Sequence, residues 1–409
     1  MTPGRPWNRS LERIRIICDS SPDHRSLRGS VLSELGRVVP FNAFVWPLSD
    51  PATATGVSPM ARVPCPEELQ LLIRLKYLTP GGRWTQLAAS SAPVTTLLRE
   101  TGGNPSLSLL WNGLMKRYGV FDVLFAVLAD KHGCWGWLDL WRTEQGGPVT
   151  GEPFTVEEVG YLAAVVHEVT PALRQSIARQ FLTDGSRESE ADRAESGESE
   201  PLRSGIVRSG GVHADRITSA AVHASASAIG GGTRPELPQQ AVLTLDADMA
   251  VVGGTSSVEE WLGLLQAGPR PFQGVPAEVL NVAAQLLALE ADVDQHPASS
   301  RVYLGSGQWA MLRASRMDSA GSVAIPPLAV TIQACPPEAR LDMFARSFGL
   351  TPRQRELIEL AAAGADTAAM AGALGIAAYT VQDQFKQIFD TCGVHSRATL
   401  LALAMGTTQ

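Results

Sequence analysis

The chain has 409 residues, of which 44% are hydrophobic and 18% are charged, and its formal net charge is −7. That composition is typical of globular proteins, and the length predicts roughly two to four domains. No stretch of about twenty apolar residues is present, which excludes a membrane-spanning helix, and the N-terminus lacks the apolar core of a signal peptide. We therefore expect a cytoplasmic protein that has no membrane partner.

The five cysteines stand at positions 18, 65, 134, 335 and 392 and form no C-x-x-C pair. Their odd number and wide spacing argue against a disulfide framework and a structural zinc site, and they favour a reducing compartment. The sequence also lacks a phosphate-binding G-x-x-x-x-G-K-S/T loop and the G-x-S-x-G and H-E-x-x-H motifs. We expect no cofactor, no bound metal and no enzymatic activity.

Residues 1–182 are predicted to form a first folded unit. The expected elements are a strand at 42–48, helices at 67–77 and 107–118, a hairpin of strands 122–129 and 134–141, and a long helix from Thr155 to Phe181. This order of elements resembles a GAF-type sensor domain. The resemblance implies an antiparallel sheet covered by helices.

The first unit is rich in tryptophan. Under strict alternation, Trp135, Trp137 and Trp141 share one face of the second hairpin strand. They could wall a ligand cavity together with other tryptophans, or they could form a core of large side chains, which is the interpretation we prefer. The candidate pocket residues are Trp46, Trp84, Trp111, Trp135, Trp137 and Trp141.

Residues 183–236 are predicted to be a linker. Their first part, 184–200, holds seven acidic side chains and two arginines, and the remainder is rich in serine, alanine and glycine. So little apolar surface cannot offset the entropy lost when a chain becomes ordered. We therefore predict a disordered segment, to which most of the net negative charge belongs.

Residues 237–335 are predicted to form a second unit. The expected elements are strands at 241–245 and 250–252, helices at 258–265 and 276–290, and strands at 301–304, 308–313 and 328–332. This order resembles a PAS domain, again with an antiparallel sheet. The sequence contains no internal repeat that relates this unit to the first.

The C-terminal residues, 336–409, carry signals for consecutive short helices. Apolar spacing at 341–348 predicts a coupling helix, and four further helices follow it. The residues expected to cap or end these four helices are Thr351, Gly364, Asp366 or Thr367, Gly375 and Ser396.

The third of the four helices, at 378–389, indicates the function. Val381, Phe385 and Ile388 fall at i, i+4 and i+7, so we expect them to face the core. The opposite face then points outward, as it does in a helix that enters the major groove of DNA. The outward side chains are Tyr379, Gln382, Asp383, Lys386 and Asp390.

The spacing of residues 348–405 resembles the LuxR-type helix-turn-helix. The matching motifs are Leu350-Thr351-Pro352-Arg353, Glu356, Gly364, Ala371, Leu374-Gly375-Ile376, Thr380-Val381, Ile388, Gly393-Val394 and Ser396-Arg397-Ala398. The string at 133–142 also looks like actinobacterial regulators of this type. The resemblance implies that Thr380 and Arg397 contact phosphates and that Gln382, Asp383 and Lys386 face base edges. The candidate DNA-binding residues are Arg353, Tyr379, Thr380, Gln382, Asp383, Gln384, Lys386, Gln387 and Arg397.

Three positions depart from that family, because Ala377, Gln382 and Gln384 stand where serine, a basic residue and histidine are usual. Residues 338–409 also carry six basic and seven acidic side chains. Since lysine and arginine supply most non-specific DNA affinity, a single copy should bind weakly. A homodimer would compensate by presenting two such helices.

We therefore expect a multidomain α+β protein, with GAF-like and PAS-like antiparallel-sheet sensor domains followed by an all-α four-helix LuxR-type module. The expected function is sequence-specific transcriptional regulation in response to a ligand or partner. The expected partners are double-stranded DNA, a second copy of the chain, a small-molecule ligand of either sensor domain, and RNA polymerase. The alternative is a non-enzymatic sensor or adaptor whose helix-turn-helix binds protein instead of DNA.

Overall fold

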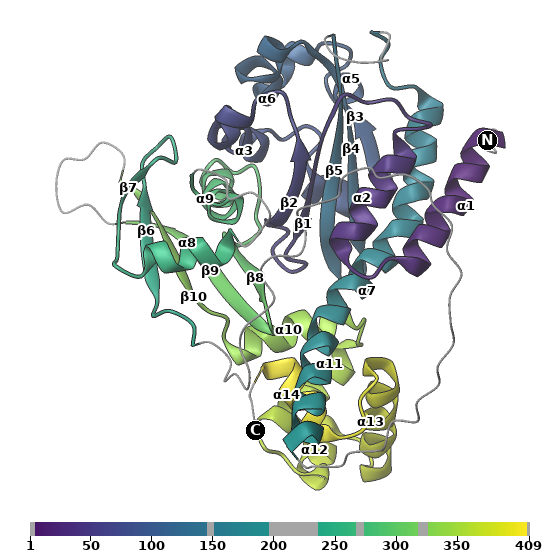
Figure 1. The fold of residues 1–409 in the computed structure, drawn as a ribbon, viewed down its shortest axis with the longest axis vertical. Coiled ribbons are helices and arrows are strands. Elements are labelled where there is room, and N and C mark those ends of the chain that lie inside the picture. Colours follow the sequence, from purple (N-terminus) through teal and green to yellow (C-terminus); the bar gives the residue numbers. More distant parts are fainter. Residues whose placement is uncertain (1–4, 145–150, 196–235, 267–273, 318–325, 407–409) are drawn as a thin grey trace, which may run out of the picture.

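The computed structural model describes residues 5–144, 151–195, 236–266, 274–317 and 326–406, and it describes 183–195 by their backbone alone. These residues form two units that are each built on a five-stranded antiparallel sheet, followed by a C-terminal helical unit (Figure 1). Among the described residues, no helix is both long and apolar enough to cross a membrane. The expected succession of two antiparallel sheets and a helical module is confirmed.

The first unit is a sheet with the strand order β2-β1-β5-β4-β3. Its strands are β1 (Ala43–Ser49), β2 (Gly56–Arg62), β3 (Val94–Thr96), β4 (Val120–Asp130) and β5 (Gly133–Thr143). Its helices are α1 (Arg5–Ser20), α2 (His24–Leu35), η1 (Pro66–Glu68), α3 (Leu69–Leu78), α4 (Trp84–Ala89), α5 (Leu97–Glu100), η2 (Pro105–Leu107), α6 (Leu109–Gly113), η3 (Met115–Tyr118) and α7 (Val156–Glu195). The central strand β5 is buried along almost its whole length, as its continuous apolar run predicts for a strand covered on both faces.

The first unit differs from the expectation in several regions, since α1, α2, α4 and α5 are not among the expected elements. The single helix expected at 107–118 is divided into η2, α6 and η3. It breaks because Ser108 caps a new helix by accepting from the Trp111 amide (3.3 Å), and Leu114 then leaves the helical region at φ −141°, ψ −62°. The sequence also does not predict β2 and β3. Both lie at edges of the sheet, where β3 has three residues and β2 contains Pro59.

Helix α7 connects the first unit to the rest of the molecule. It begins with a reciprocal cap, in which the Glu158 amide donates to Thr155 Oγ1 (3.2 Å) and the Thr155 amide donates to Glu158 Oε2 (2.8 Å). The helix ends at Glu195, beyond residue 183 where the linker is expected to start. The remainder of the expected linker, up to 235, lies outside the described residues.

The second unit repeats the strand order of the first, as β7-β6-β10-β9-β8. Its elements are β6 (Ala241–Leu245), β7 (Val251–Gly254), α8 (Val258–Leu265), α9 (Ala277–Glu290), β8 (Ser299–Gly305), β9 (Gln308–Arg316) and β10 (Leu328–Ala334). Every element expected in this unit is present. The common strand order shows that the two units share a topology although no sequence repeat relates them.

Helix α9 lies between the two sheets, packing on its own sheet and against α3 and β2 of the first unit (Figure 1). Polar contacts cross this seam. Asn281 Nδ2 donates to the Gly56 carbonyl (2.9 Å), and the Ser58 amide donates to Glu278 Oε1 (3.0 Å). The guanidinium of Arg83, which is fully buried, binds Asp294 Oδ2 at 2.6 Å. The seam is therefore a packed and hydrogen-bonded interface.

The C-terminal unit consists of a coupling helix and four short helices, as expected. The helices are α10 (Pro337–Ser347), α11 (Pro352–Ala362), α12 (Thr367–Leu374), α13 (Ala378–Cys392) and α14 (Arg397–Met405). Both α10 and α14 pack against α7. The long exit helix of the first unit therefore contacts the C-terminal unit directly.

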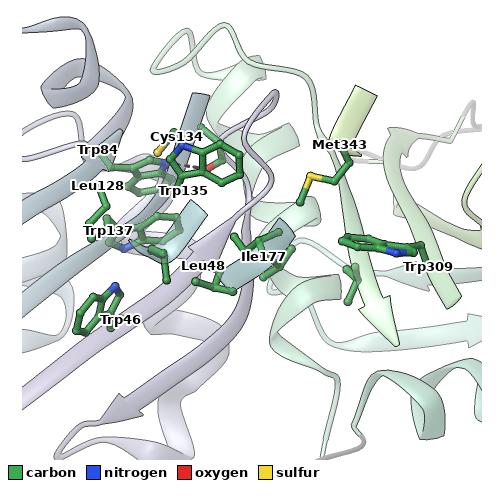
Figure 2. Packing of buried hydrophobic residues seen from close by; sticks show 14 of the residues in the cluster. Trp46, Leu48, Trp84, Leu128, Cys134, Trp135, Trp137, Ile177, Trp309 and Met343 are labelled. Carbon is green, nitrogen blue, oxygen red and sulfur yellow. Dashed lines mark hydrogen bonds between the residues drawn. The ribbon is translucent and has the colours of Figure 1, made fainter. Parts of the chain in front are cut away.

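An aromatic cluster forms where the three units meet. Figure 2 shows the apolar core continuing from the first unit, through Leu48 and Ile177, towards Trp309 of β9. Beside it, the Phe181 ring of α7 stacks on Trp309 (5.1 Å, 20°) and meets Phe344 of α10 edge-on (5.4 Å, 90°). Phe181 and Phe344 are fully buried. One ring of α7 therefore packs against both following units.

A buried arginine also connects the same three units through salt bridges. Arg301 of β8 binds Asp50, at the end of β1, through Nη2–Oδ1 (2.6 Å) and Nε–Oδ2 (2.7 Å). Its Nη1 binds Asp342 of α10 at 2.7 Å. Asp342 also forms salt bridges with Arg346 of its own helix and with Arg355 of α11. The side chains of Arg301 and Asp50 are 4% and 1% exposed. This cluster, Asp50–Arg301–Asp342, is called the junction below.

Candidate functional site

The first helix of the C-terminal unit, α11, begins with two reciprocal hydrogen bonds. The Gln354 amide donates to Thr351 Oγ1 (3.2 Å), and the Thr351 amide donates to Gln354 Oε1 (3.0 Å). This capping box satisfies two helix-end donors at once. The cap predicted at Thr351 is confirmed, and Leu357 and Ile358 of the following stripe are fully buried.

A tight turn joins α12 to α13. Asp366 caps α12 by accepting from the Ala369 amide (2.7 Å), which resolves the choice between Asp366 and Thr367. Gly375 ends α12 at φ +63°, a left-handed conformation in which a side chain is strained. Ala377 then stands at the N-cap of α13, where it supplies no side-chain hydrogen bond.

Helix α13 has the two faces that its sequence predicts. Val381, Phe385 and Ile388 are buried in the bundle. The opposite face is exposed with the rest of the described chain in place, and Tyr379 is 70% exposed. The other exposed residues of this face are Gln382, Asp383, Lys386, Gln387 and Asp390, while Thr380 and Gln384 are half-buried. Within the described residues, neither sheet unit covers the outward face of α13.

Two arginines of the candidate set flank this face. Arg353 of α11 donates to Glu356 (2.9 Å) and to the carbonyl of Leu374, the last residue of α12. It therefore holds the turn before α13. The guanidinium of Arg397 lies 4.5 Å from the centre of the Phe385 ring, where a cation–π contact fixes it beside α13. Both candidate residues lie next to the helix that the sequence identifies.

Comparison with known families bears on this unit alone. Residues 349–404 match the family described as "Bacterial regulatory proteins, luxR family". These residues form a LuxR-family helix-turn-helix domain. No curated protein matches the chain. The match covers α11 to α14, and it assigns no family to the two sheet units.

The LuxR-family domain is docked through its coupling helix. Arg340 of α10, which is buried, donates to the Leu403 carbonyl at the end of α14 (3.0 Å) and to the Gly307 carbonyl between β8 and β9. Arg346 donates to the His132 carbonyl in the β4–β5 turn (2.9 Å), and Arg174 of α7 donates to the Ser347 carbonyl (3.2 Å). Both sheet units therefore contact the helix that leads into the domain.

The uncapped start of α13 gives a first prediction. Ala377→Ser should supply the missing N-cap oxygen and stabilise α13 by about 1 kcal/mol, because serine outranks alanine at this position by about 0.5–2 kcal/mol. Hydrogen exchange should then slow at the first amides of α13. Ala377→Val, which also lacks an oxygen, is the matched control. Equal exchange in both variants would contradict the prediction.

A second candidate site is a cavity of about 380 Å³ in the first unit, between its sheet and α3. It is lined by β1, β2, β5 and α3, and Ala277 and Asn281 of α9 complete it from the second unit. Exposed residues of β2, including Arg62, also line it, so the cavity reaches the surface there.

Only part of the predicted tryptophan set lines this cavity. Trp137 and Trp141 do, and Trp84 stacks behind Trp137 with ring centres 3.9 Å apart. Trp46, Trp111 and Trp135 pack elsewhere. Trp135 is the extra residue of a bulge, since Leu128 pairs with Gly136 and Ala129 with Cys134. Strict alternation along this strand, which would place Trp135 with Trp137 and Trp141, is therefore interrupted.

Two charged residues that line the cavity, Lys76 and Asp139, are not among the residues that the sequence identifies as candidates. Lys76 Nζ and Asp139 Oδ2 form a buried ion pair at 2.8 Å, and both side chains line the cavity. Burial lowers the pKa of Lys76 and raises the pKa of Asp139, against their mutual attraction. A single aspartate inside an apolar strand is the one signal that could have indicated this pair.

Proposed function

We propose that this chain is a sequence-specific DNA-binding transcription regulator, in which α13 enters the major groove. The observation that carries the proposal is the exposed polar face of α13 within a LuxR-family domain. Helices of this kind read base edges with side chains of their outward face. Gln382, Asp383 and Lys386 are the residues proposed to face bases, with Thr380, Arg397 and Arg353 at the phosphates. Tyr379, Gln384 and Gln387 complete the proposed contact set.

The two sheet units are proposed to be the sensor part of this regulator. Their common strand order supports a GAF-like domain at 1–182 and a PAS-like domain at 237–335 as related sensor modules. The remaining residues, 336–409, would be the DNA-binding part. We propose that a bound ligand or partner changes how these units contact α10. RNA polymerase is proposed as a partner on DNA.

Charge favours a homodimer as the DNA-binding species. The outward face of α13 offers one lysine against two aspartates, so a single domain has little attraction for phosphates. Two copies on half-sites about one helical turn apart would multiply the effect of each weak contact. The same charge count supports the alternative function, an adaptor whose C-terminal domain binds protein.

The test is charge reversal at Lys386. Lys386→Glu should weaken binding to genomic fragments selected by the purified protein by about 1–3 kcal/mol, and it should reduce the dependence of affinity on salt. Lys116→Glu is the matched control, since Lys116 is also an exposed lysine but lies in the first unit. Affinity would be measured by fluorescence anisotropy across a salt series.

The outcome separates the two functions. A specific loss in Lys386→Glu, with the fold intact by circular dichroism, supports DNA binding through α13. If no genomic fragment is selected, or if both variants bind as the wild type does, α13 does not read DNA. The adaptor function would then be the better proposal.

A further inference from the structure

One lysine of the chain lies in the wall of an apolar cavity. The sequence has four lysines, and the three at positions 116, 131 and 386 are exposed. The side chain of Lys76 is only 11% exposed, and it lines the cavity of about 380 Å³ beneath α3. Lysine is rarely buried, because its ammonium is costly to remove from water. Lys76 is therefore a candidate for a chemical role.

The ion pair that Lys76 forms is open to the cavity. Lys76 Nζ lies 2.8 Å from Asp139 Oδ2, and Asp139 also lines the cavity. The second oxygen, Asp139 Oδ1, has no hydrogen-bond partner among the described residues, and it is not one of their enclosed partnerless atoms. This oxygen therefore faces open space, whereas the indole nitrogens of the flanking Trp137 and Trp141 are enclosed.

Burial favours a neutral amine at Lys76. It lowers the pKa of Lys76 and raises the pKa of Asp139, although the two groups attract each other. Both shifts favour transfer of the ammonium proton to the carboxylate. The rings of Phe125 and Trp84, with centres 4.4 Å and 5.7 Å from Nζ, hold the amine in place without accepting its proton. A neutral amine is a nucleophile, and burial in an apolar pocket is one way in which proteins activate lysine.

The remaining lining determines what kind of molecule fits. Lys76 and Asp139 neutralise each other, and Arg62 is exposed at the mouth, so a charged ligand would find no buried unpaired counter-charge. The volume falls within the range of about 300–1,000 Å³ for small-molecule sites. The apolar side chains of the wall include Val45, Leu72, Ile73 and Leu110.

We propose that Lys76 binds an apolar aldehyde in this cavity as a Schiff base. Asp139 first takes the ammonium proton. The amine nitrogen then attacks the carbonyl carbon, and a proton moves from nitrogen to oxygen to give a carbinolamine. Asp139 returns its proton to the hydroxyl, which leaves as water while the C=N bond forms. The products are a protonated imine, its Asp139 counter-ion and one water, and no oxidant or reductant is consumed.

The adduct would lie at the seam between the two sheet units, because Ala277 and Asn281 of α9 complete the cavity wall. Its formation could therefore alter how α9 packs on the first unit. This inference deepens the proposed sensor role and rests on it for its regulatory meaning. Adduct formation itself does not require DNA.

Reductive trapping on the full chain tests the proposal. The probe is 2-naphthaldehyde, which is flat and apolar, and sodium cyanoborohydride converts its imine into a stable secondary amine. Peptide mass spectrometry gives the rate of modification at each lysine. A pKa lower by one unit gives about tenfold more neutral amine near pH 7, so Lys76 should react about tenfold faster than any exposed lysine. Equal rates, or no adduct at Lys76, would overturn the proposal.

Glyoxylate is the matched charged aldehyde. Its carboxylate should keep it out of the apolar cavity, so we expect it to modify the three exposed lysines and to spare Lys76. If glyoxylate modified Lys76 as fast as 2-naphthaldehyde does, Lys76 would be reacting from solvent, and the assignment of an apolar ligand would be wrong.

Two variants locate the adduct. Ala277 is half-buried in the cavity wall, and Ala277→Phe should slow trapping at Lys76 by filling the cavity from α9, without changing the rate at Lys116. Lys76→Arg keeps a cation beside Asp139 but cannot form this imine. It should abolish the imine absorbance that 2-naphthaldehyde produces without reductant, whereas the matched control Lys116→Arg should retain it.

Imine absorbance that persists in Lys76→Arg, or trapping at Lys76 that is unchanged in Ala277→Phe, would contradict the assignment. Circular dichroism checks that each variant is folded. The DNA affinity of Lys386→Glu is measured without aldehyde, so failure of the aldehyde site and failure of the DNA-binding function give separate results.

Discussion

Replacing Arg301 by methionine should lower the free energy of unfolding by about 3–5 kcal/mol. The substitution leaves Asp50 buried without its bidentate partner, and it removes one of the arginines that Asp342 binds. A buried carboxylate that loses its counter-charge retains its desolvation cost, and losses of this size follow. Urea unfolding, followed by far-ultraviolet circular dichroism, would measure the change.

The matched control is Arg15→Met. Arg15 pairs with Glu168 at 2.8 Å, but its side chain is 53% exposed, so solvent already screens the pair. We expect almost no change in this variant. A loss in Arg301→Met no larger than that in Arg15→Met would contradict a stabilising role for the junction.

The junction also predicts a pH dependence. Burial alone would raise the pKa values of Asp50 and Asp342. The charge and hydrogen bonds of Arg301, together with the Ala52 amide at Asp50 and Arg346 at Asp342, outweigh burial and hold both pKa values below their ordinary range. The stability that these carboxylates contribute is therefore present above their unfolded pKa of about 3.9 and is lost as pH falls through the lower folded values. In Arg301→Met the buried Asp50 should titrate higher. The difference in stability between wild type and variant should thus narrow as pH falls towards about 4.

The C-terminal unit could be predicted from sequence because its signals are local. Thr351, Asp366 and Ser396 each bond an amide within three residues, and Gly375 ends a helix by its own conformation. Helical periodicity then separates the buried face of α13 from the exposed one. Each of these signals lies within one or two helical turns, so no tertiary information is needed.

The arrangement of the two sheet units could not be predicted in the same way. Their common strand order depends on which strands pair, and β3 has too few residues to be recognised at all. The contacts that join the units link residues far apart in the chain, such as Asp50 with Arg301 and Arg83 with Asp294. Nothing near either arginine in sequence indicates its partner.

The cavity shows the same limit at single residues. Tryptophan content indicates an aromatic interior, but the bulge at Trp135 and the stacking of Trp84 decide which rings face the open space. The Lys76–Asp139 pair forms only because the fold places α3 beside β5, and this packing is not encoded in the local sequence. Sequence patterns therefore predict that the interior is aromatic, but they do not predict which residues line the cavity.

Phe181→Ala is expected to lower the free energy of unfolding by as much as Arg301→Met does. It tests the apolar packing at the place where the three units meet. Phe181 is fully buried between Trp309 and Phe344, and the guanidinium of Arg340 lies 5.3 Å from its ring centre. Removing a buried phenyl ring costs about 3–5 kcal/mol when the cavity does not collapse. The loss should appear as a lower urea midpoint.

The position of the ring also predicts where the structure loosens. Because Phe181 of α7 packs against both β9 and α10, hydrogen exchange should accelerate in α10 and α14 and remain slow in β4 and β5. Phe44→Ala is the matched control, since Phe44 is half-buried and pairs only loosely with Phe41 (6.2 Å) within the first unit. It should leave exchange in α10 unchanged.

Phe181→Leu distinguishes packing from any special role of the aromatic ring. Leucine keeps most of the apolar volume, so it should recover much of the stability lost in Phe181→Ala while losing the stacking on Trp309. If the units communicate through this contact, exchange in α10 should recover together with stability. Uniform acceleration across all three units in Phe181→Ala would instead mean that the ring supports a single cooperative fold, and the Phe181 contact would then not be a separate link between the first unit and the C-terminal unit.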